Sequence, residues 1–131
     1  MIGLDTNVLI RFFVKDDPEQ SLRAKELIDS LTKEEPGWIA LTTVVELVWV
    51  INRRLRGGRT AVTTILGQML TREDIVIENS TLVERAFQRY RNGNADFADC
   101  LIAVSGHAAG CSKTVTFDRK APRDAGMELL A

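Results

Sequence analysis

Short apolar runs alternate with longer segments of helical periodicity along this chain. The apolar runs span residues 1–4, 38–41, 74–77 and 114–117. Between them, apolar residues recur every three to four positions, which is the spacing of amphipathic helices. The alternation predicts an α/β protein. Because strands joined through helices almost always run parallel, the pattern also predicts a mostly parallel sheet of four to five strands.

Residues that start helices follow each apolar run. Asp, Ser and Thr are preferred caps, and Pro is favoured in a first helical turn. The expected helices begin after Asp5 to Asn7, at Asp16 to Glu19 with an end near Lys33, at Thr42 or Thr43, at Thr60, at Ser80 or Thr81, and just before Phe97. Gly57-Gly58 and Gly110 are expected to end two of them. Residues 128–131 are a further candidate edge strand.

The composition predicts one compact domain over residues 1–131. Of these residues 45% are hydrophobic and 27% are charged, as in ordinary globular proteins. The net charge is −1, so no global positive field attracts nucleic acid or membranes, and any contact with a polyanion must be local. The longest uncharged run, Cys100 to Ser112, is shorter than the ~18–20 residues that cross a bilayer. These features predict a soluble protein of the cytoplasm.

The few sulfur and imidazole groups exclude two kinds of chemistry. One His and two Cys cannot supply the four ligands of a structural zinc site. Cys100 and His107 would lie about 10 Å apart along one helix, too far to form a nucleophile and its base. Both cysteines are therefore predicted to be buried small side chains in a reducing compartment.

Acidic residues stand where a parallel sheet places functional groups, beyond the carboxyl ends of its strands. Asp5 follows the first strand and Asp118 the fourth, so both are expected at one edge of the sheet. Glu46 is expected over the same edge, in the first turn of its helix. Asp96 and Asp99 are three positions apart, hence neighbours on one face at a helix start.

Each of these acids also has an ordinary interpretation, because Asp commonly caps helices and ends strands. Their combination changes the picture. Carboxylates within about 4–6 Å of one another repel, so a cluster needs protons or a cation. Carboxylate oxygens without His or Cys partners suit Mg²⁺ or Mn²⁺. The pattern therefore indicates a site for a divalent metal ion.

Four segments of the chain carry these acids within recognisable motifs. They are Ile2 to Leu9 (IGLDTNVL), Thr43 to Leu47 (TVVEL), Ala95 to Ala103 (ADFADCLIA) and Thr116 to Asp118 (TFD). Together they resemble the PIN-domain ribonucleases, in particular the VapC-like toxins of bacterial type II toxin-antitoxin pairs. The resemblance spans nearly the whole chain and implies a three-layer α/β/α fold, with the whole chain forming a single PIN-like nuclease domain.

The resemblance also implies which residues act. By position, the family's metal-binding acids fall on Asp5, Glu46, Asp99 and Asp118, with Asp96 as an additional member of the acidic pocket. Polar positions that line the site fall on Thr6, Asn7 and Thr116. The implied reaction is hydrolysis of RNA phosphodiester bonds with one or two Mg²⁺ or Mn²⁺ ions. Glu46 would complete the metal shell or accept a proton from the attacking water.

Positive charge around the acids is needed to hold an RNA substrate. The candidates are Arg53, Arg54, Arg56 and Arg59, followed by Arg11, Lys15, Arg119 and Lys120. An equally good interpretation of the first group is a solvated, favourably charged helix end. The resemblance further implies a homodimer and a cognate antitoxin. Large apolar residues predict either such a contact surface or plain core: Phe12, Phe13, Trp38, Val48, Trp49 and Ile51.

Two alternatives from other functional classes stay open. One is a metal-binding PIN-like scaffold without nuclease activity, which would need a defect that the four acids do not reveal. The other is a signalling module with a phosphoacceptor carboxylate. A receiver-like module is expected to carry an acid pair in its first strand-to-helix loop, whereas Asp5 stands alone there. The spacing therefore disfavours the signalling module.

Overall fold

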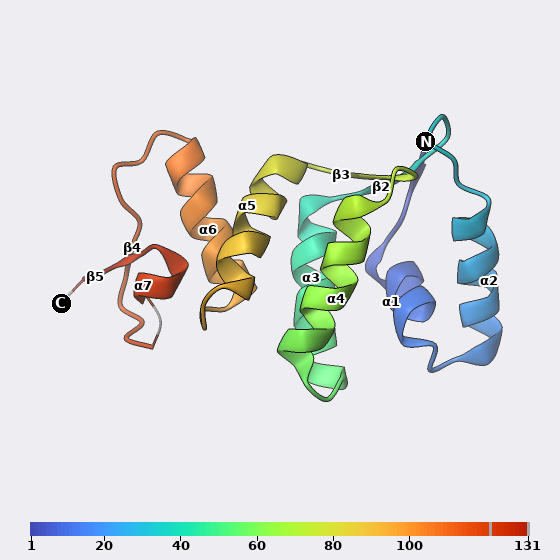
Figure 1. Ribbon diagram of the computed structural model, residues 1–131, viewed down its shortest axis with the longest axis horizontal. Helices are drawn as coiled ribbons and strands as arrows, with labels where there is room; N and C mark the ends of the chain where they lie inside the picture. The colour runs from blue at the N-terminus through green and yellow to red at the C-terminus, as the bar shows by residue number, and fades with distance from the viewer. Residues whose placement is uncertain (121, 131) are drawn as a thin grey trace. The chain divides into compact units, whose positions relative to one another are not determined.

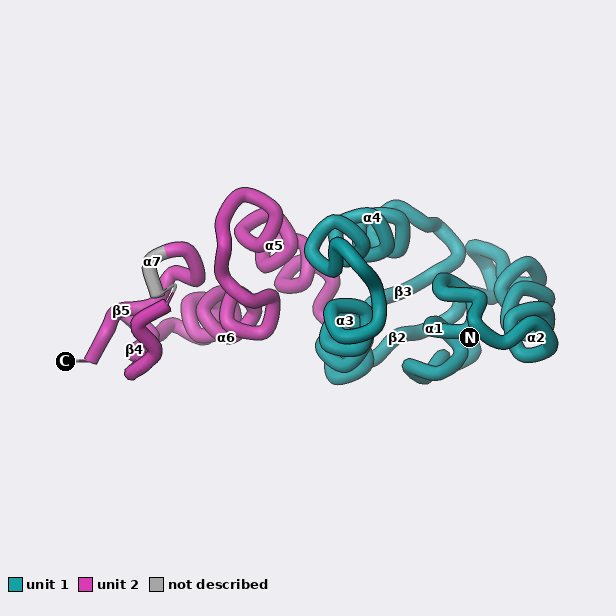
Figure 2. The backbone as a smooth tube through the Cα atoms, turned by 90° about the horizontal axis from the view of Figure 1, so that it is seen from below, with its two compact units in different colours: residues 1–78 teal, residues 79–131 magenta. Residues whose placement is uncertain are grey.

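The computed structural model describes residues 1–120 and 122–130. The chain divides into two compact units, residues 1–78 and residues 79–131 (Figure 2). The prediction of a single domain over the whole chain stays a prediction.

The first unit contains a parallel sheet of three short strands in the order β1-β2-β3. They are β1 (Ile2–Gly3), β2 (Gly37–Ile39) and β3 (Ile75–Ile77). Trp38 lies opposite Gly3 on one side and Val76 on the other. Because side chains alternate along a strand, Ile75 and Ile77 are buried while Val76 is exposed. The predicted parallel arrangement is confirmed for these strands.

Four helices of the first unit connect these strands. They are α1 (Thr6–Val14), α2 (Pro18–Asp29), α3 (Leu41–Arg54) and α4 (Gly58–Thr71). Helix α1 packs against α2 and α3, and α3 packs against α4 (Figure 1). The apolar stripe of α3, including Val44 and Leu47, is fully buried together with Leu66 of α4. This burial supplies the main stabilisation of the unit.

The second unit begins with two antiparallel helices, α5 (Ser80–Arg91) and α6 (Phe97–Ala108). Their contact buries Tyr90 and Phe97, whose rings meet edge to face with centroids 5.9 Å apart. The chain continues with β4 (Val115–Thr116), α7 (Pro122–Ala125) and β5 (Glu128–Leu129). No helix in the described part of the chain has an apolar stretch long enough to cross a membrane.

The grouping of the strands differs from the prediction of one sheet of four to five strands. In the described residues, β4 pairs in parallel with β5 in a separate sheet of two strands. Val115 lies opposite Glu128, and Thr116 lies opposite Leu129. The candidate edge strand is thus confirmed over Glu128–Leu129, while residue 131 lies outside the described residues. A strand of two residues has too little apolar surface to specify its partner from sequence.

Three helix boundaries also differ from prediction, and one of them is the start of α4, which lies at Gly58 and not at Thr60. Helix α2 ends at Asp29 and not near Lys33, with Ser30 as its C-cap. Helix α3 begins at Leu41, because its N-cap is Ala40 and not Thr42 or Thr43. The first backbone amide of α3 has a hydrogen-bond acceptor that is distant in the sequence, because Leu41 N donates to Glu78 Oε1 at 2.8 Å.

Candidate metal and catalytic site

Asp5 follows β1 after one intervening residue, Leu4, and is the N-cap residue of α1. Its Oδ1 accepts a hydrogen bond from the backbone amide of Val8 at 3.1 Å. The cap forms because Leu4 is buried and anchors the strand, while Asp5 itself stays exposed. Next to it, Thr6 is buried and Asn7 is exposed. One oxygen of Asp5 therefore stabilises the helix start, which fixes the direction of the carboxylate.

Glu46 lies on α3 and is exposed, between the buried residues Val44 and Leu47. Because the helix begins at Leu41, Glu46 falls in its second turn and not in the first as predicted. Helices α1 and α3 pack against each other, so the helices that follow Asp5 and carry Glu46 are neighbours in the first unit.

Three of the candidate acids, Asp96, Asp99 and Asp118, belong to the second unit, and the charges of two of them affect the pKa of the third. Asp96 is the N-cap residue of α6, and Asp99 lies in the first turn of that helix. Burial raises the pKa of the Asp99 carboxyl, and the negative charges of Asp96 and Asp118 raise this pKa further. The structure thus brings Asp96, Asp99 and Asp118 within electrostatic range of one another.

Asp118 is held in a tight turn after β4. Its backbone amide donates to Thr116 Oγ1 at 3.0 Å, and its Oδ1 accepts from the amide of Lys120 at 2.8 Å. Thr116 therefore shapes the turn that carries Asp118, as its predicted place in the site suggests. The predicted common sheet edge for Asp5 and Asp118 is not formed, because β1 belongs to the three-stranded sheet and β4 pairs with β5.

The donor chemistry of these residues suits a hard divalent cation. All are carboxylates, and their mutual repulsion is what a cation would relieve. Over residues 1–120 and 122–130, however, no group of three or more His, Cys, Asp or Glu side chains forms a ready metal cage. The donor types therefore fit Mg²⁺ or Mn²⁺. The three coupled acids belong to the second unit, and Asp5 and Glu46 belong to the first.

Glu78 is an acid at the sheet edge that the sequence analysis missed. It follows β3 directly, whereas Leu4 separates Asp5 from β1, and its carboxylate caps α3 through the amide of Leu41. The signal was the same in both places, an acid after an apolar strand. Glu78 was overlooked because no family motif includes it.

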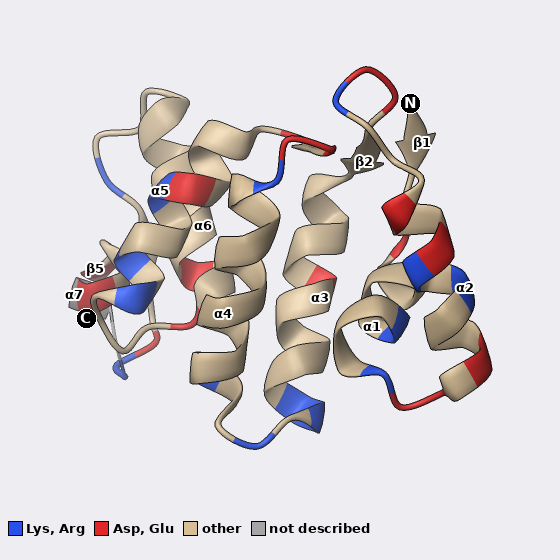
Figure 3. Cartoon of the chain, turned by 45° about the vertical axis from the view of Figure 1, so that its right-hand side comes forward, with Lys and Arg blue, Asp and Glu red and all other residues tan. Residues whose placement is uncertain are grey.

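The basic residues at the end of α3 are accessible. Arg53, Arg54 and Arg56 are exposed where α3 ends and the chain turns toward α4 (Figure 3). The Arg53 guanidinium lies 4.6 Å from the centroid of the Trp49 ring. Arg59 is half-buried at the start of α4. The first three residues thus form an exposed positive surface.

Arg11 is held by its neighbours. Its Nη1 contacts Asp16 Oδ1 at 2.6 Å, and its Nε donates to Gln20 Oε1 at 2.6 Å. The ion pair with Asp16 reduces the positive charge that Arg11 offers to RNA. Arg119, by contrast, is exposed after the turn of Asp118.

The apolar and sulfur residues divide between core and surface. Val48 and Ile51 are core residues, whereas the Trp49 side chain is 58% exposed. Phe12, Phe13 and Trp38 are half-buried. Cys100 is buried as predicted, but the same prediction for Cys111 is wrong, because Cys111 lies beyond the end of α6 and is exposed.

These features define an α/β protein with acidic side chains at strand ends and helix starts. The family model described as the PIN domain matches residues 2–126. The chain therefore belongs to the PIN domain family. Members of this family have a three-layer α/β/α fold and are generally nucleases that use divalent metal ions. No curated protein matches the chain significantly.

Proposed function

We propose that this protein is a divalent-metal-dependent endoribonuclease, the toxin of a type II toxin-antitoxin pair that a cognate antitoxin inhibits in the cytoplasm. The observation that carries the proposal is the raised pKa of Asp99, caused by burial and by the charges of Asp96 and Asp118, in a PIN domain. Acids gathered at a cost in electrostatic energy are typical of metal-dependent sites.

Asp5, Glu46, Asp99 and Asp118 are the residues that we assign to one or two Mg²⁺ or Mn²⁺ ions, with Asp96 in the same acidic pocket. A bound ion would supply a more acidic water and charge to offset the phosphate oxygens. Metal binding would favour the ionised form of Asp99, whose pKa is raised in the metal-free protein.

The other groups of the chain position these carboxylates. The amide of Val8 fixes one oxygen of Asp5, and the hydroxyl of Thr116 fixes the turn of Asp118. Glu46 would either serve as a further ligand of a bound ion or accept the proton of the attacking water at a carboxylate oxygen. Thr6 and Asn7 lie beside Asp5 and line the same site.

Arg53, Arg54 and Arg56 are the residues that we assign to the RNA backbone, with lesser roles for Arg11, Arg59 and Arg119. Each phosphate contact releases counterions, so binding weakens as salt rises. Replacing the first three by Ala should weaken RNA binding and flatten its salt dependence. An unchanged salt slope would remove them from the binding surface.

The decisive experiment follows cleavage of a panel of RNAs with Mg²⁺, with Mn²⁺ and with EDTA. Cleavage should require the metal, and Asp99→Asn should reduce its rate by about 100-fold or more. Glu84→Gln is the matched control, since it neutralises an exposed acid of α5 in the same unit. If Asp5→Asn and Asp99→Asn keep full activity, the assigned site is wrong.

A metal-binding scaffold or signalling module without nuclease activity is the second candidate. Such a protein would leave every RNA intact with either metal. The same panel therefore separates the two functions.

The partners that we propose are a second copy of the chain and the antitoxin. The exposed Trp49 side chain supports this, because large aromatic residues are enriched in protein interfaces. Sedimentation at micromolar concentration should give a dimer. A monomer at that concentration would contradict the homodimer.

A further inference from the structure

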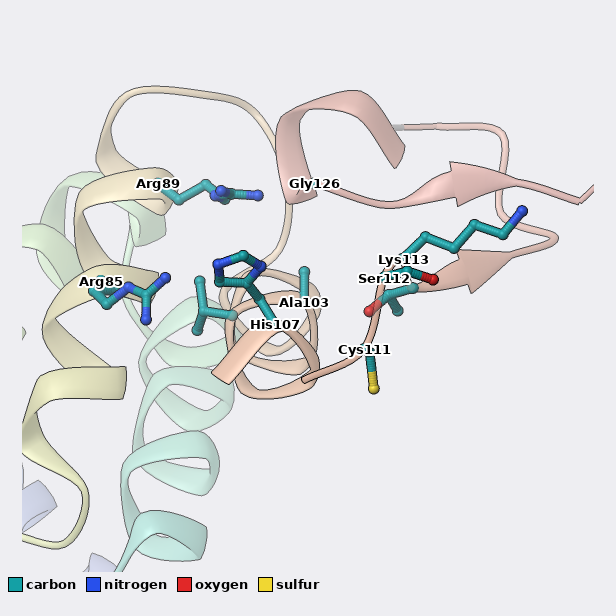
Figure 4. A pocket seen from close by; sticks show the side chains of 10 residues that line it. Arg85, Arg89, Ala103, His107, Cys111, Ser112, Lys113 and Gly126 are labelled. Atoms are coloured by element: carbon teal, nitrogen blue, oxygen red, sulfur yellow. The ribbon is translucent and has the colours of Figure 1, made fainter. Parts of the chain in front are cut away.

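A basic pocket of about 180 Å³ lies within the second unit, between α5, α6 and the segment after α6 (Figure 4). Its cationic and imidazole groups come from Arg85, Arg89, His107 and Lys113. The hydroxyls of Ser112 and Thr114 add further donors. The described lining contains no carboxylate. The pocket therefore concentrates hydrogen-bond donors and positive charge.

A hydrogen bond and the space beside a glycine hold the Arg89 side chain in this pocket. Its Nη1 donates to the carbonyl oxygen of Ala125 at 3.1 Å. Gly126 adopts φ +84°, and a Cβ at that position would lie 1.6 Å from the same Nη1. Glycine is therefore needed for both the backbone conformation and the space that the guanidinium occupies.

Arg85 stands one turn before Arg89 on the same face of α5, and both reach toward the side of α6 that carries His107 (Figure 4). Like charges at this spacing repel each other and destabilise a helix. Within residues 1–120 and 122–130, Arg85 has no ion pair or hydrogen bond. Lys113, by contrast, contacts Glu128 with Nζ to Oε1 at 3.3 Å. Among the basic side chains of the pocket, Arg85 therefore carries the positive charge that neighbouring groups neutralise least.

The size and donors of the pocket define its ligand. Small-molecule pockets usually measure about 300–1,000 Å³, so about 180 Å³ suits a small anionic group better than a nucleoside. Guanidinium groups match the oxygens of phosphate with paired hydrogen bonds. We propose that this pocket binds a phosphate group, with the RNA backbone as its favoured source. That source rests on the proposed nuclease function, whereas the phosphate chemistry rests on the pocket alone.

The first test measures binding of a labelled single-stranded oligoribonucleotide in EDTA, where cleavage cannot interfere. Arg85→Gln should weaken binding about tenfold, the loss expected for one charge-assisted contact. Arg91→Gln removes the same charge from the same helix, but Arg91 lies outside the pocket with its guanidinium 5.7 Å from the Phe87 ring centroid. This control should change binding by less than about threefold. Equal losses in the two variants would overturn the proposal.

The second test uses Cys111, which lines the pocket and is exposed, whereas Cys100 is buried. The rate of alkylation of Cys111 is measured alone and with inorganic phosphate, AMP, the oligoribonucleotide or an acidic peptide of equal charge. Cys111→Ser identifies the labelled site. Protection by phosphate or AMP shows that the phosphate group suffices, and protection by the oligoribonucleotide alone assigns the pocket to the RNA backbone.

Protection by the acidic peptide alone, or by none of these probes, would overturn the proposal. Arg85→Gln should remove the protection, and Arg91→Gln should retain it. Because neither test uses a metal, phosphate binding at the pocket can stand even if no RNA is cleaved. Conversely, RNA cleavage can depend on Asp99 while no probe slows the alkylation of Cys111. That result would reject phosphate binding at this pocket and leave the proposed nuclease function standing.

Discussion

The carboxylate of Asp5 accepts a hydrogen bond from the backbone amide of Val8, and through this contact it caps α1. The residue that we propose as a metal ligand is therefore also part of the fold. Its two roles can be separated, because capping needs an acceptor oxygen whereas metal binding needs charge.

Asp5→Asn should leave the free energy of unfolding within about 0.5 kcal/mol of the wild-type value, because Asn caps helices as well as Asp does. Asp5→Ala should lower it by about 1 kcal/mol, because the α1 amide loses its partner. Both variants should lose metal-dependent RNA cleavage. Urea denaturation and the cleavage assay measure the two effects. A fully stable Ala variant would reject the cap, and an active Asn variant would reject the metal assignment.

The stability of the metal-free protein should depend on the charge of Asp99. Its folded-state pKa lies above the ordinary Asp value, so ionisation disfavours the folded state. Stability should therefore fall as pH rises from the unfolded-state pKa through the raised folded-state pKa. Asp99→Asn should remove this pH dependence and raise the free energy of unfolding at neutral pH by about 0.5 kcal/mol, the scale of like-charge repulsion on helices. Denaturation from pH 3 to 8 measures it, and a destabilised Asn variant would contradict it.

A bound metal ion should reverse the order of stability of the wild type and the Asp99→Asn variant. An ion that binds only the folded state stabilises it by about 2.7 kcal/mol at 100 times its Kd. Saturating Mn²⁺ should thus raise the Tm of the wild type by several degrees and that of Asp99→Asn much less. Glu84→Gln, which changes an exposed acid, should respond as the wild type does. Equal Tm shifts in all three proteins would contradict a role for Asp99 in metal binding.

The sequence predicted the order of elements where local chemistry determined them. Asp5 and Asp17 both cap their helices, and Pro18 opens α2 as expected. The apolar runs of β2 and β3 became strands with buried side chains, whereas Ile2 of β1 and Val115 of β4 are exposed. The start of α3 could not be predicted, since its cap is Glu78, thirty-seven positions away in the chain.

The residues of the candidate site stay a prediction, and only part of their arrangement could be foreseen from the sequence. Asp96 and Asp99 are close in sequence, so their interaction follows from helix geometry. Asp118 joins them because Thr116 and the pairing of β4 with β5 set its turn, and a two-residue strand does not reveal its partner. The repeated Arg85 and Arg89 alone indicate a solvated helix face, and the basic pocket could not be predicted because His107 and Lys113 share no motif with them.

The cap that Glu78 provides predicts a stability effect far from the acids of α6. Glu78→Ala should lower the free energy of unfolding by about 1 kcal/mol, because Leu41 loses the acceptor of its amide and Ala40 provides no side-chain cap. Glu78→Gln keeps an acceptor oxygen and should stay within about 0.5 kcal/mol of the wild type. Urea denaturation of both variants measures the effect. Equal losses in the Ala and Gln variants would show that charge, and not the hydrogen bond, matters.

The pair formed by Arg72 and Asp74 should contribute to acid stability. Arg72 donates from Nε to Oδ1 and from Nη2 to Oδ2, both at 2.8 Å. The hydrogen bond from Arg72 lowers the pKa of Asp74, so its stabilisation is present above the ordinary Asp pKa and is lost as pH falls through the folded-state value.

Asp74→Asn should therefore lower the free energy of unfolding by about 1 kcal/mol at neutral pH and by much less near pH 2. Glu19→Gln breaks a single contact to Arg23 between side chains that are 78% and 77% exposed, so it should change stability by less than about 0.5 kcal/mol. Denaturation of both variants at the two pH values measures how much more the half-buried pair of Arg72 and Asp74, with its two hydrogen bonds, contributes to stability than the solvated ion pair of Arg23 and Glu19. If the two variants lost the same stability at neutral pH, the geometry of the Arg72 fork would have no energetic consequence.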